Sequence, residues 1–166
     1  MKIIDIDTVK EWLKEYLENE KEIDSDIERL EHLVAKMTGA GAQALTGMPR
    51  SSNASTDRMA DMLARKEELE ESIRERVSSQ SIMRKEIEAI LRHLPKPEER
   101  SVIRMRYFDR SEWKEVQEMM FGSNPDFEDR FDTYERRMHK HHRSACENIA
   151  KYIGTHDIPI TSFPSD

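Results

Sequence analysis

The feature that most constrains the fold is a hydrophobic repeat near the N-terminus, which advances in alternating steps of three and four residues. Its apolar members are Ile6, Val9, Leu13, Tyr16, Ile23, Ile27, Leu30, Val34 and Met37, and Glu20 fills the remaining slot. This spacing lines the apolar side chains along one stripe of an α-helix and is typical of coiled coils. The repeat therefore predicts a long helix, from about residue 7 to Met37, that packs against a partner helix.

A second and weaker repeat of the same kind follows. Its members are Met59, Met62, Lys66, Leu69, Ile73, Arg76, Gln80, Met83, Ile87, Ile90 and Leu94. When the two repeats are laid antiparallel, the charged members Glu20 and Arg76 fall opposite each other. The stretch between the repeats, residues 38–56, is rich in small residues, so we predict a flexible loop there. These patterns predict an antiparallel helical hairpin, a coiled coil, over residues 1–94.

Shorter elements are expected after the hairpin. Pro95 and Pro97 end the second long helix, because proline cannot continue a helix interior. Three shorter helices are expected at about residues 97–107, 111–121 and 128–153, and a break at Gly122 separates the last two. This order has the skeleton of a helix-turn-helix domain over residues 95–153, followed by an irregular tail over residues 154–166. The predicted fold class is therefore all-α.

Charge is distributed unevenly along the chain, which carries a net charge of −7. Residues 130–151 contain six Lys or Arg against three Asp or Glu, a balance of +3, which leaves −10 for the rest. On a helical projection of the last helix, the inward stripe consists of Tyr134, Met138, His141, Ala145, Ile149 and Tyr152. Arg136 and Arg143 point the opposite way, so the outer face of this helix should be cationic.

A cationic outer face on the third helix of such a domain is what contact with duplex DNA requires. We therefore predict that the chain binds duplex DNA through Arg130, Arg136, Arg137, His139, Lys140 and Arg143. The simpler alternative is that these side chains form a solvated helix face with no ligand.

The sequence also excludes several classes of protein. The chain contains no phosphate-binding glycine loop and no nucleophile motif, so we expect neither enzymatic activity nor a cofactor. His139, His142 and Cys146 share one helix face and could hold zinc, but no fourth ligand is evident, so we predict no metal site. A single cysteine, the lack of a signal-peptide pattern and the lack of an apolar run of about 18 residues favour a cytoplasmic protein without a membrane span.

Several stretches resemble a known family. Residues 94–109 and 113–120 resemble the start of region 4 of sigma-70 factors, in which a proline precedes an arginine-rich helix that ends in Arg-Tyr. Residues 8–153 as a whole resemble a phage and prophage family related to RinA-type and ArpU-type transcription regulators. The matching stretches are residues 48–50, 57–60, 83–87, 104–108 and 136–145. The resemblance implies control of phage or mobile-element genes, although the acidic residues within 123–132 are an insertion relative to region 4.

Two functions remain open from the sequence. The first is a transcriptional regulator that binds DNA as a homodimer. We expect the coiled coil to form the dimer contact, because the weak second repeat leaves Val77 and Leu91 uncovered. The second is a protein-interaction module that has lost DNA binding and binds RNA polymerase or another host protein. The acidic insertion and the net charge of −7 favour this second function.

Overall fold

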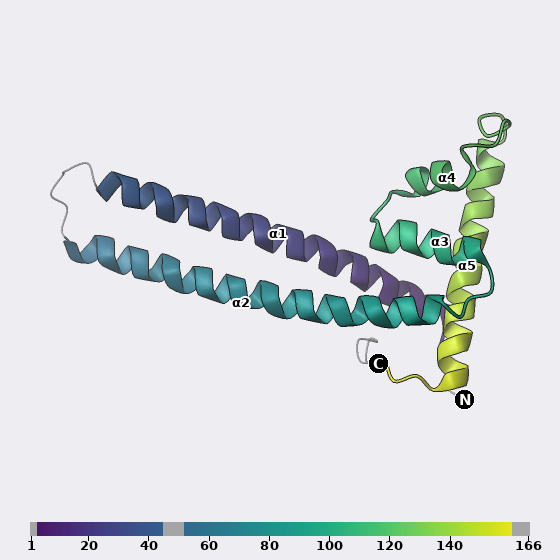
Figure 1. The fold of residues 1–166 in the computed structure, drawn as a ribbon, viewed down its shortest axis with the longest axis horizontal. Helices are drawn as coiled ribbons and strands as arrows, with labels where there is room; N and C mark the ends of the chain where they lie inside the picture. Colours follow the sequence, from purple (N-terminus) through teal and green to yellow (C-terminus); the bar gives the residue numbers. More distant parts are fainter. Residues whose placement is uncertain (1–2, 45–51, 161–166) are drawn as a thin grey trace. The chain divides into compact units, whose positions relative to one another are not determined.

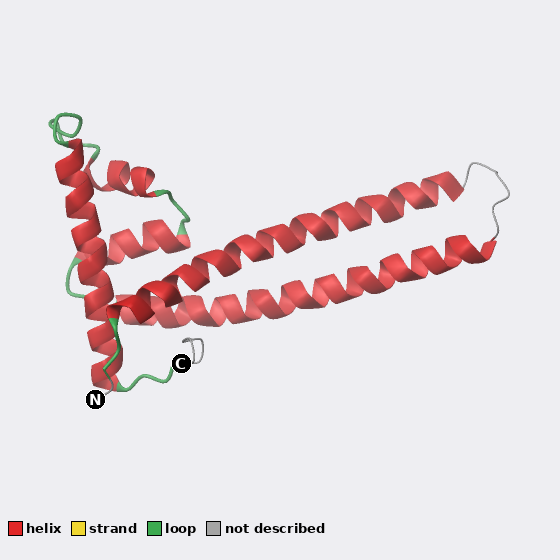
Figure 2. Ribbon diagram, turned by 180° about the vertical axis from the view of Figure 1, so that it is seen from behind, coloured by secondary structure: helices red, strands yellow, loops and turns green. Residues whose placement is uncertain are grey.

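The structure is a computed structural model that describes residues 3–44 and 52–160, and every regular element in these ranges is helical (Figures 1 and 2). In chain order, the elements are α1 (Ile6–Ala44), α2 (Ser52–Leu91), α3 (Pro97–Ile103), the π-helical turn η1 (Arg104–Phe108), α4 (Trp113–Phe121) and α5 (Phe131–His156). The all-α prediction is confirmed. Within the described residues, no helix has an apolar stretch long enough to span a bilayer.

Both long helices extend into the predicted loop at residues 38–56. α1 continues to Ala44 and α2 begins at Ser52, so the prediction of a loop over this whole stretch is wrong. The extension of α1 contains three alanines, which have the highest helix propensity, together with Gly39 and Gly41. The centre of the predicted loop, residues 45–51, lies outside the described residues, as does the matching stretch at residues 48–50.

The chain divides into two compact units. The first unit consists of Met1–Glu18 and Ser81–Asp166, and the second consists of Asn19–Gln80. Each long helix therefore contributes one part to each unit. We describe the units one at a time.

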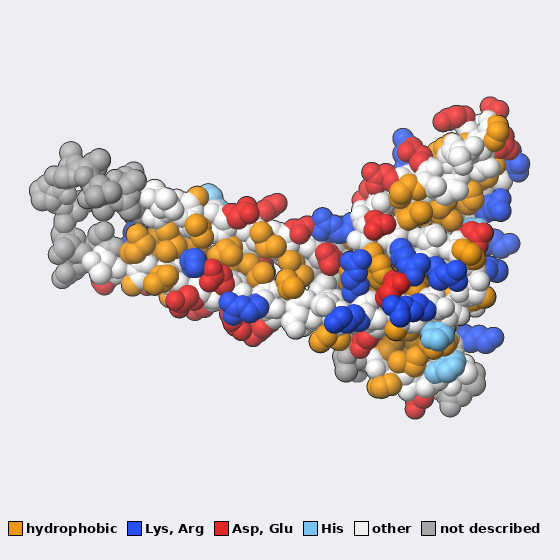
Figure 3. Space-filling model, in the orientation of Figure 1, with side chains coloured by type: hydrophobic (Ala, Val, Ile, Leu, Met, Phe, Trp, Pro, Cys, Tyr) orange, Lys and Arg blue, Asp and Glu red, His pale blue; other side chains and the backbone are white. Residues whose placement is uncertain are grey.

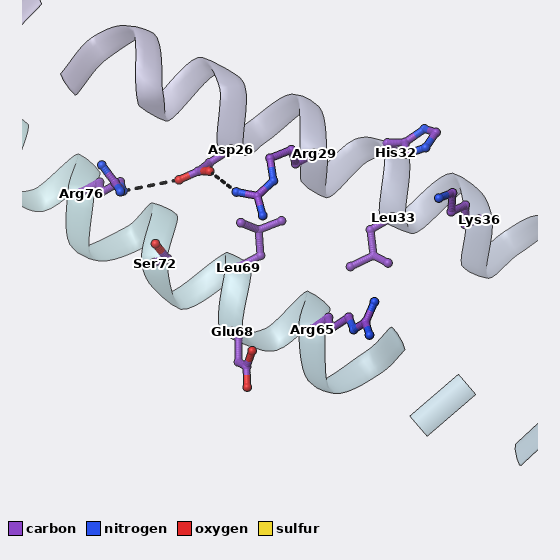
Figure 4. A pocket seen from close by; sticks show the side chains of 10 residues that line it. All are labelled: Asp26, Arg29, His32, Leu33, Lys36, Arg65, Glu68, Leu69, Ser72 and Arg76. Atoms are coloured by element: carbon purple, nitrogen blue, oxygen red, sulfur yellow. Dashed lines mark hydrogen bonds and ion pairs between the residues drawn. The ribbon is translucent and has the colours of Figure 1, made fainter. Parts of the chain in front are cut away.

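In the second unit, stretches of α1 and α2 run antiparallel and are joined by polar contacts. Gln80 Nε2 donates to Glu20 Oε1 at 3.1 Å. Arg76 pairs with Glu22 and, at 3.4 Å, with Asp26, which also binds Arg29 at 2.8 Å (Figure 4). The predicted register placed Arg76 opposite Glu20, and the structure instead brings Gln80 there, about one helical turn along α2. A neutral amide is less costly to bury than a guanidinium, and Gln80 is buried whereas Arg76 is exposed.

The first unit holds the main hydrophobic core. It is built from the start of α1, the end of α2 and the three later α-helices, and includes Val9, Trp12, Leu13, Tyr16, Met83, Ile87, Leu91, Val102, Ile103, Val116, Met138 and Ile149. Leu91, which we expected to be uncovered, is fully buried, because it belongs to this core. Val77 lies in the second unit and is 47% exposed, as expected.

The inward stripe predicted for the last helix is confirmed at four of its positions. Tyr134, Met138, Ala145 and Ile149 are buried, whereas His141 and Tyr152 are half-buried. The helix also ends later than predicted. Gly154 is buried inside α5, so residues 154–156 are not part of an irregular tail. Asp157 ends the helix, because it adopts a left-handed conformation (φ 47°) and its N–H bonds to the carbonyl of Ile153. Residues 161–166 lie outside the described residues.

The helix starts in the first unit follow from local chemistry. Pro97 occupies the first turn of α3, where its fixed φ and missing N–H are tolerated. α4 begins at Trp113 rather than near Ser111, because Arg110 has a positive φ of 58° and turns the chain. Glu112 and Glu115 then form a capping box, in which the Glu112 N–H donates to Glu115 at 2.8 Å.

A buried carboxylate fixes α3 to α5. Glu99 is fully buried and accepts hydrogen bonds from Ser144 Oγ at 2.6 Å and from Asn148 Nδ2 at 2.8 Å. Lys96 Nζ lies 3.7 Å from Glu99 Oε1, the oxygen that also accepts from Ser144, and supplies a counter-charge. Buried charges persist only when they are paired and hydrogen-bonded, so this network sets how α5 is rotated against α3.

We expect Glu99→Ala to lower the free energy of unfolding by roughly 1–3 kcal/mol, because the half-buried polar groups of Ser144 and Asn148 lose their acceptor. Urea denaturation followed by circular dichroism measures the change. Glu98→Ala, at the neighbouring exposed position, is the control and should change stability little. Equal stabilities of the two variants would contradict a fixing role for Glu99.

Candidate nucleic-acid interface

The outer face of α5 carries five of the six predicted DNA-binding residues. Arg136, Arg137, His139, Lys140 and Arg143 are all exposed, and the sixth residue, Arg130, is exposed at the N-cap. The opposite face of the same helix is buried in the core of the first unit. The burial pattern therefore directs these side chains to solvent.

Arg136, Lys140 and Arg143 form the part of this face that is open to a ligand, and we call these three residues the α5 surface. Arg136 Nε donates to the Asp132 carbonyl at 3.2 Å, a bond that leaves its charge uncompensated. Arg143 Nε lies 3.0 Å from Glu147, but both side chains are largely exposed, at 75% and 53%. Exposed ion pairs contribute at most about 1 kcal/mol, so an incoming phosphate can displace this one.

Arg130 and Arg137 are also exposed, but each guanidinium lies near an aromatic ring of the unit. Arg130 pairs with Asp126 at 3.2 Å, and its guanidinium lies 5.9 Å from the Tyr134 ring. The guanidinium of Arg137 lies 5.5 Å from the Phe121 ring. These two arginines therefore connect α5 to the segments that precede it, and they are less available to a ligand than the α5 surface.

The acidic insertion is folded against the start of α5. Phe127 is buried and its ring lies 5.7 Å from that of Phe131. Tyr134 Oη donates to Asp126 at 2.7 Å, and this bond, with the ion pair to Arg130, lowers the pKa of the Asp126 carboxyl. One carboxylate of the insertion is thus held by the protein itself, and residues 128, 129 and 132 remain exposed near the helix N-terminus. Carboxylates at that end stabilise the helix, and cationic side chains dominate from Arg136 onward.

An aromatic and histidine cluster lies beneath the α5 surface. The ring of Trp113 lies 5.0 Å from His139 and 4.9 Å from His142. His142 shares a 2.9 Å hydrogen bond with the Tyr107 hydroxyl, and burial lowers the pKa of His142 to about 4. Burial also raises the pKa of the Cys146 thiol to about 12. His142 and Cys146 are thus neutral near pH 7, and they pack α5 on η1 rather than adding charge.

The candidate zinc ligands His139, His142 and Cys146 belong to this cluster, and two of them make other contacts. His139 packs against Trp113, and the ring nitrogen of His142 bonds to Tyr107. Throughout residues 3–44 and 52–160, the structure contains no group of three or more His, Cys, Asp or Glu side chains arranged to hold a metal ion.

His142 should make stability pH-dependent. The unfolded chain protonates this residue near pH 6.5, whereas the folded protein does so only near pH 4. Between these values the unfolded state binds more protons, so the free energy of unfolding should fall as the pH is lowered through this window. Urea titrations at about pH 7 and about pH 5 measure the loss, and His142→Gln should reduce it. An undiminished loss in the variant would assign the effect elsewhere, for example to His141, whose pKa burial also lowers.

Sequence analysis missed a second cationic group in the first unit. Arg84 and Arg92 on α2 and Arg104 on η1 surround Glu88, and we call this group the Glu88 arginine cluster. Two signals were present in the sequence. Arg84, Glu88 and Arg92 are spaced four residues apart, which places them on one helix face. Residues 84–106 also contain seven Lys or Arg against four Glu, a balance of +3 that equals that of residues 130–151.

Arg106 is a further residue that the sequence did not single out. Its guanidinium lies 4.9 Å from the Trp113 ring, and Nη1 donates to the Ser111 carbonyl at 2.8 Å. Arg106 thereby holds the segment between η1 and α4. No local pattern could identify this role, because it depends on tertiary contacts.

Comparison of the chain with protein-family models, with characterised proteins and with solved structures finds no significant match. The resemblance to sigma-70 region 4 and to phage regulators therefore stays a prediction from the quoted residues.

Proposed function

We propose that the protein is a DNA-binding transcriptional regulator and that the α5 surface contacts duplex DNA. The observation that carries the proposal is the two-sided character of α5. Its apolar face is buried in the core, and Arg136, Lys140 and Arg143 are exposed on the other side. Closely spaced cations on a rigid helix suit a polyanion, and arginine can also form paired hydrogen bonds to guanine in the major groove.

The packing of α4 on α5 supports a helix-turn-helix interpretation. The rings of Phe121 and Tyr134 lie 5.0 Å apart, and the buried Gln117 donates to the Phe131 carbonyl at 2.8 Å. In such domains the last helix enters the major groove while the preceding helix supports it. The segment between them, residues 122–130, is longer than the usual turn, so we expect contact to centre on Arg136, Lys140 and Arg143 rather than on the first turn of α5.

The remaining parts of the proposal concern assembly and cellular role. We propose a cytoplasmic homodimer that associates through α1 and α2, in which the helices form an antiparallel hairpin. Exposed apolar side chains in the second unit support this, among them Ile27, Val34, Leu63 and Val77. The resemblance to phage and prophage regulators makes control of mobile-element genes the role that we propose.

A protein-interaction module is the second candidate. The exposed acidic residues 128, 129 and 132 and the 52% exposed Met119 on α4 favour it. A protein partner can contact both apolar and acidic groups, whereas acidic groups repel DNA. RNA polymerase or another host protein would be the ligand. Retention of such a protein on the immobilised chain, without any shift of duplex DNA, would favour this function over the first.

We expect Arg136→Gln with Arg143→Gln to weaken duplex binding. Each lost phosphate contact should reduce the magnitude of the slope of log Kobs against log salt by about 0.9, so the double variant should lose roughly two. Fluorescence anisotropy with genomic duplex fragments at about 0.05–0.2 M salt measures this slope.

The matched control for this measurement is Lys14→Gln with Arg74→Gln. These side chains are 71% and 70% exposed and lie in i,i+4 and i,i+3 ion pairs, much like Arg143. The control removes the same charge and should keep the wild-type slope. Indistinguishable binding by the α5 variant and the control would refute DNA contact by the α5 surface.

A further inference from the structure

In the Glu88 arginine cluster, Arg104 binds the Glu88 carboxylate, and Arg84 and Arg92 lie one helical turn before and after Glu88. Arg104 binds both oxygens of Glu88, through Nε at 3.2 Å and Nη2 at 2.6 Å. The hydrogen bonds from Arg104 lower the pKa of Glu88, and the charges of Arg104, Arg92 and Arg84 act in the same direction. With Glu88 ionised, the cluster keeps an excess of two positive charges.

Contacts within the first unit position the guanidinium groups of Arg84 and Arg104 while leaving them open to solvent. Arg84 is exposed, and its guanidinium lies 4.5 Å from the ring of Phe108, which in turn packs edge-on against Tyr16. Arg92 is exposed, and Arg104 remains 38% exposed despite its pairing with Glu88. Figure 3 shows Lys and Arg side chains gathered over the C-terminal part of α2 and over α3. Arg84 and Arg104 are therefore ordered before any ligand arrives.

The chemistry of this surface fits phosphate better than an acidic protein. Arginine presents a planar fork that forms two parallel hydrogen bonds with a phosphate or a carboxylate, so the apolar surroundings decide between the two. Protein interfaces need an apolar centre, and here Phe108 is partly buried and covered by Arg84. Nucleic-acid interfaces, in contrast, are polar and strongly positive. The Glu88 arginine cluster is likewise positively charged and exposes little apolar area.

We propose that the Glu88 arginine cluster is a second phosphate-binding surface, which grips the backbone of the duplex that the α5 surface contacts. This inference rests on the proposed function. Both surfaces belong to the first unit, and Glu99 joins α3 to α5 within it, so the two surfaces are held by one folded body. Arg84, Arg92 and Arg104 contact phosphates and add affinity without reading sequence, because backbone contacts carry no base information.

The test measures salt dependence of duplex binding by the full chain and by Arg84→Gln with Arg92→Gln. Arg104 is left in place, because its removal would leave the half-buried Glu88 without a partner. The probe is a set of genomic duplex fragments, measured at about 0.05–0.2 M salt. We expect the slope of log Kobs against log salt to lose roughly two in magnitude, since two phosphate contacts are removed. Lys14→Gln with Arg74→Gln should keep the full slope, and Arg92→Gln alone should lose about one.

The outcomes separate this inference from the proposed function. If Arg136→Gln with Arg143→Gln weakens binding while Arg84→Gln with Arg92→Gln behaves like the control, α5 contacts DNA and the Glu88 arginine cluster does not. Absence of duplex binding by the unmodified chain overturns both. If Arg84→Gln with Arg92→Gln loses retention on polyglutamate but keeps its DNA slope, the surface serves an acidic protein and the proposal is wrong. Circular dichroism of each variant shows that the chain is folded.

Discussion

The structure of the first unit depends on how α5 is fixed against α3 and α4. Its apolar stripe supplies most of the contact, but a stripe alone allows small rotations of a helix about its own axis. The buried Glu99 carboxylate removes this freedom, because it must stay bonded to Ser144 and Asn148. Once that rotation is fixed, Arg136, Lys140 and Arg143 are directed to solvent. The candidate interface is thus a consequence of the buried network on the other side of the helix.

Some charged side chains of this unit contact other groups of the protein, and others form exposed cationic surfaces. Arg130 and Tyr134 both bind Asp126, and so attach the acidic insertion to α5, whereas the guanidinium of Arg137 lies over the Phe121 ring of α4. The histidine below the interface, His142, is kept neutral by burial, and the nearby charges of Lys10 and Arg106 also lower its pKa. An overall charge of −7 therefore coexists with locally cationic surfaces, because the excess of carboxylates lies on other segments. Net charge is a poor guide to the ligand of a chain whose charges are segregated in this way.

Both cationic surfaces proposed here use arginine more than lysine, and the reason is structural. A guanidinium can stack on a ring or bind a carboxylate and still present donors outward. Arg84 over Phe108 and Arg104 on Glu88 are examples. Such contacts order the side chain in advance, so less conformational entropy is lost when a phosphate binds. The same groups thus serve the fold and a candidate ligand at once.

The sequence by itself determined the helical class, the long repeats and the buried stripe of α5 at Tyr134, Met138, Ala145 and Ile149, because a period of 3.6 residues is a local property. It also pointed to the exposed cations of α5. Only the tertiary structure decided that Gln80 rather than Arg76 meets Glu20, that Leu91 is buried, and that Arg104 joins Arg84 and Arg92 around Glu88. These outcomes depend on the cost of burying charge and on contacts between segments far apart in the chain, and no local pattern contains that information.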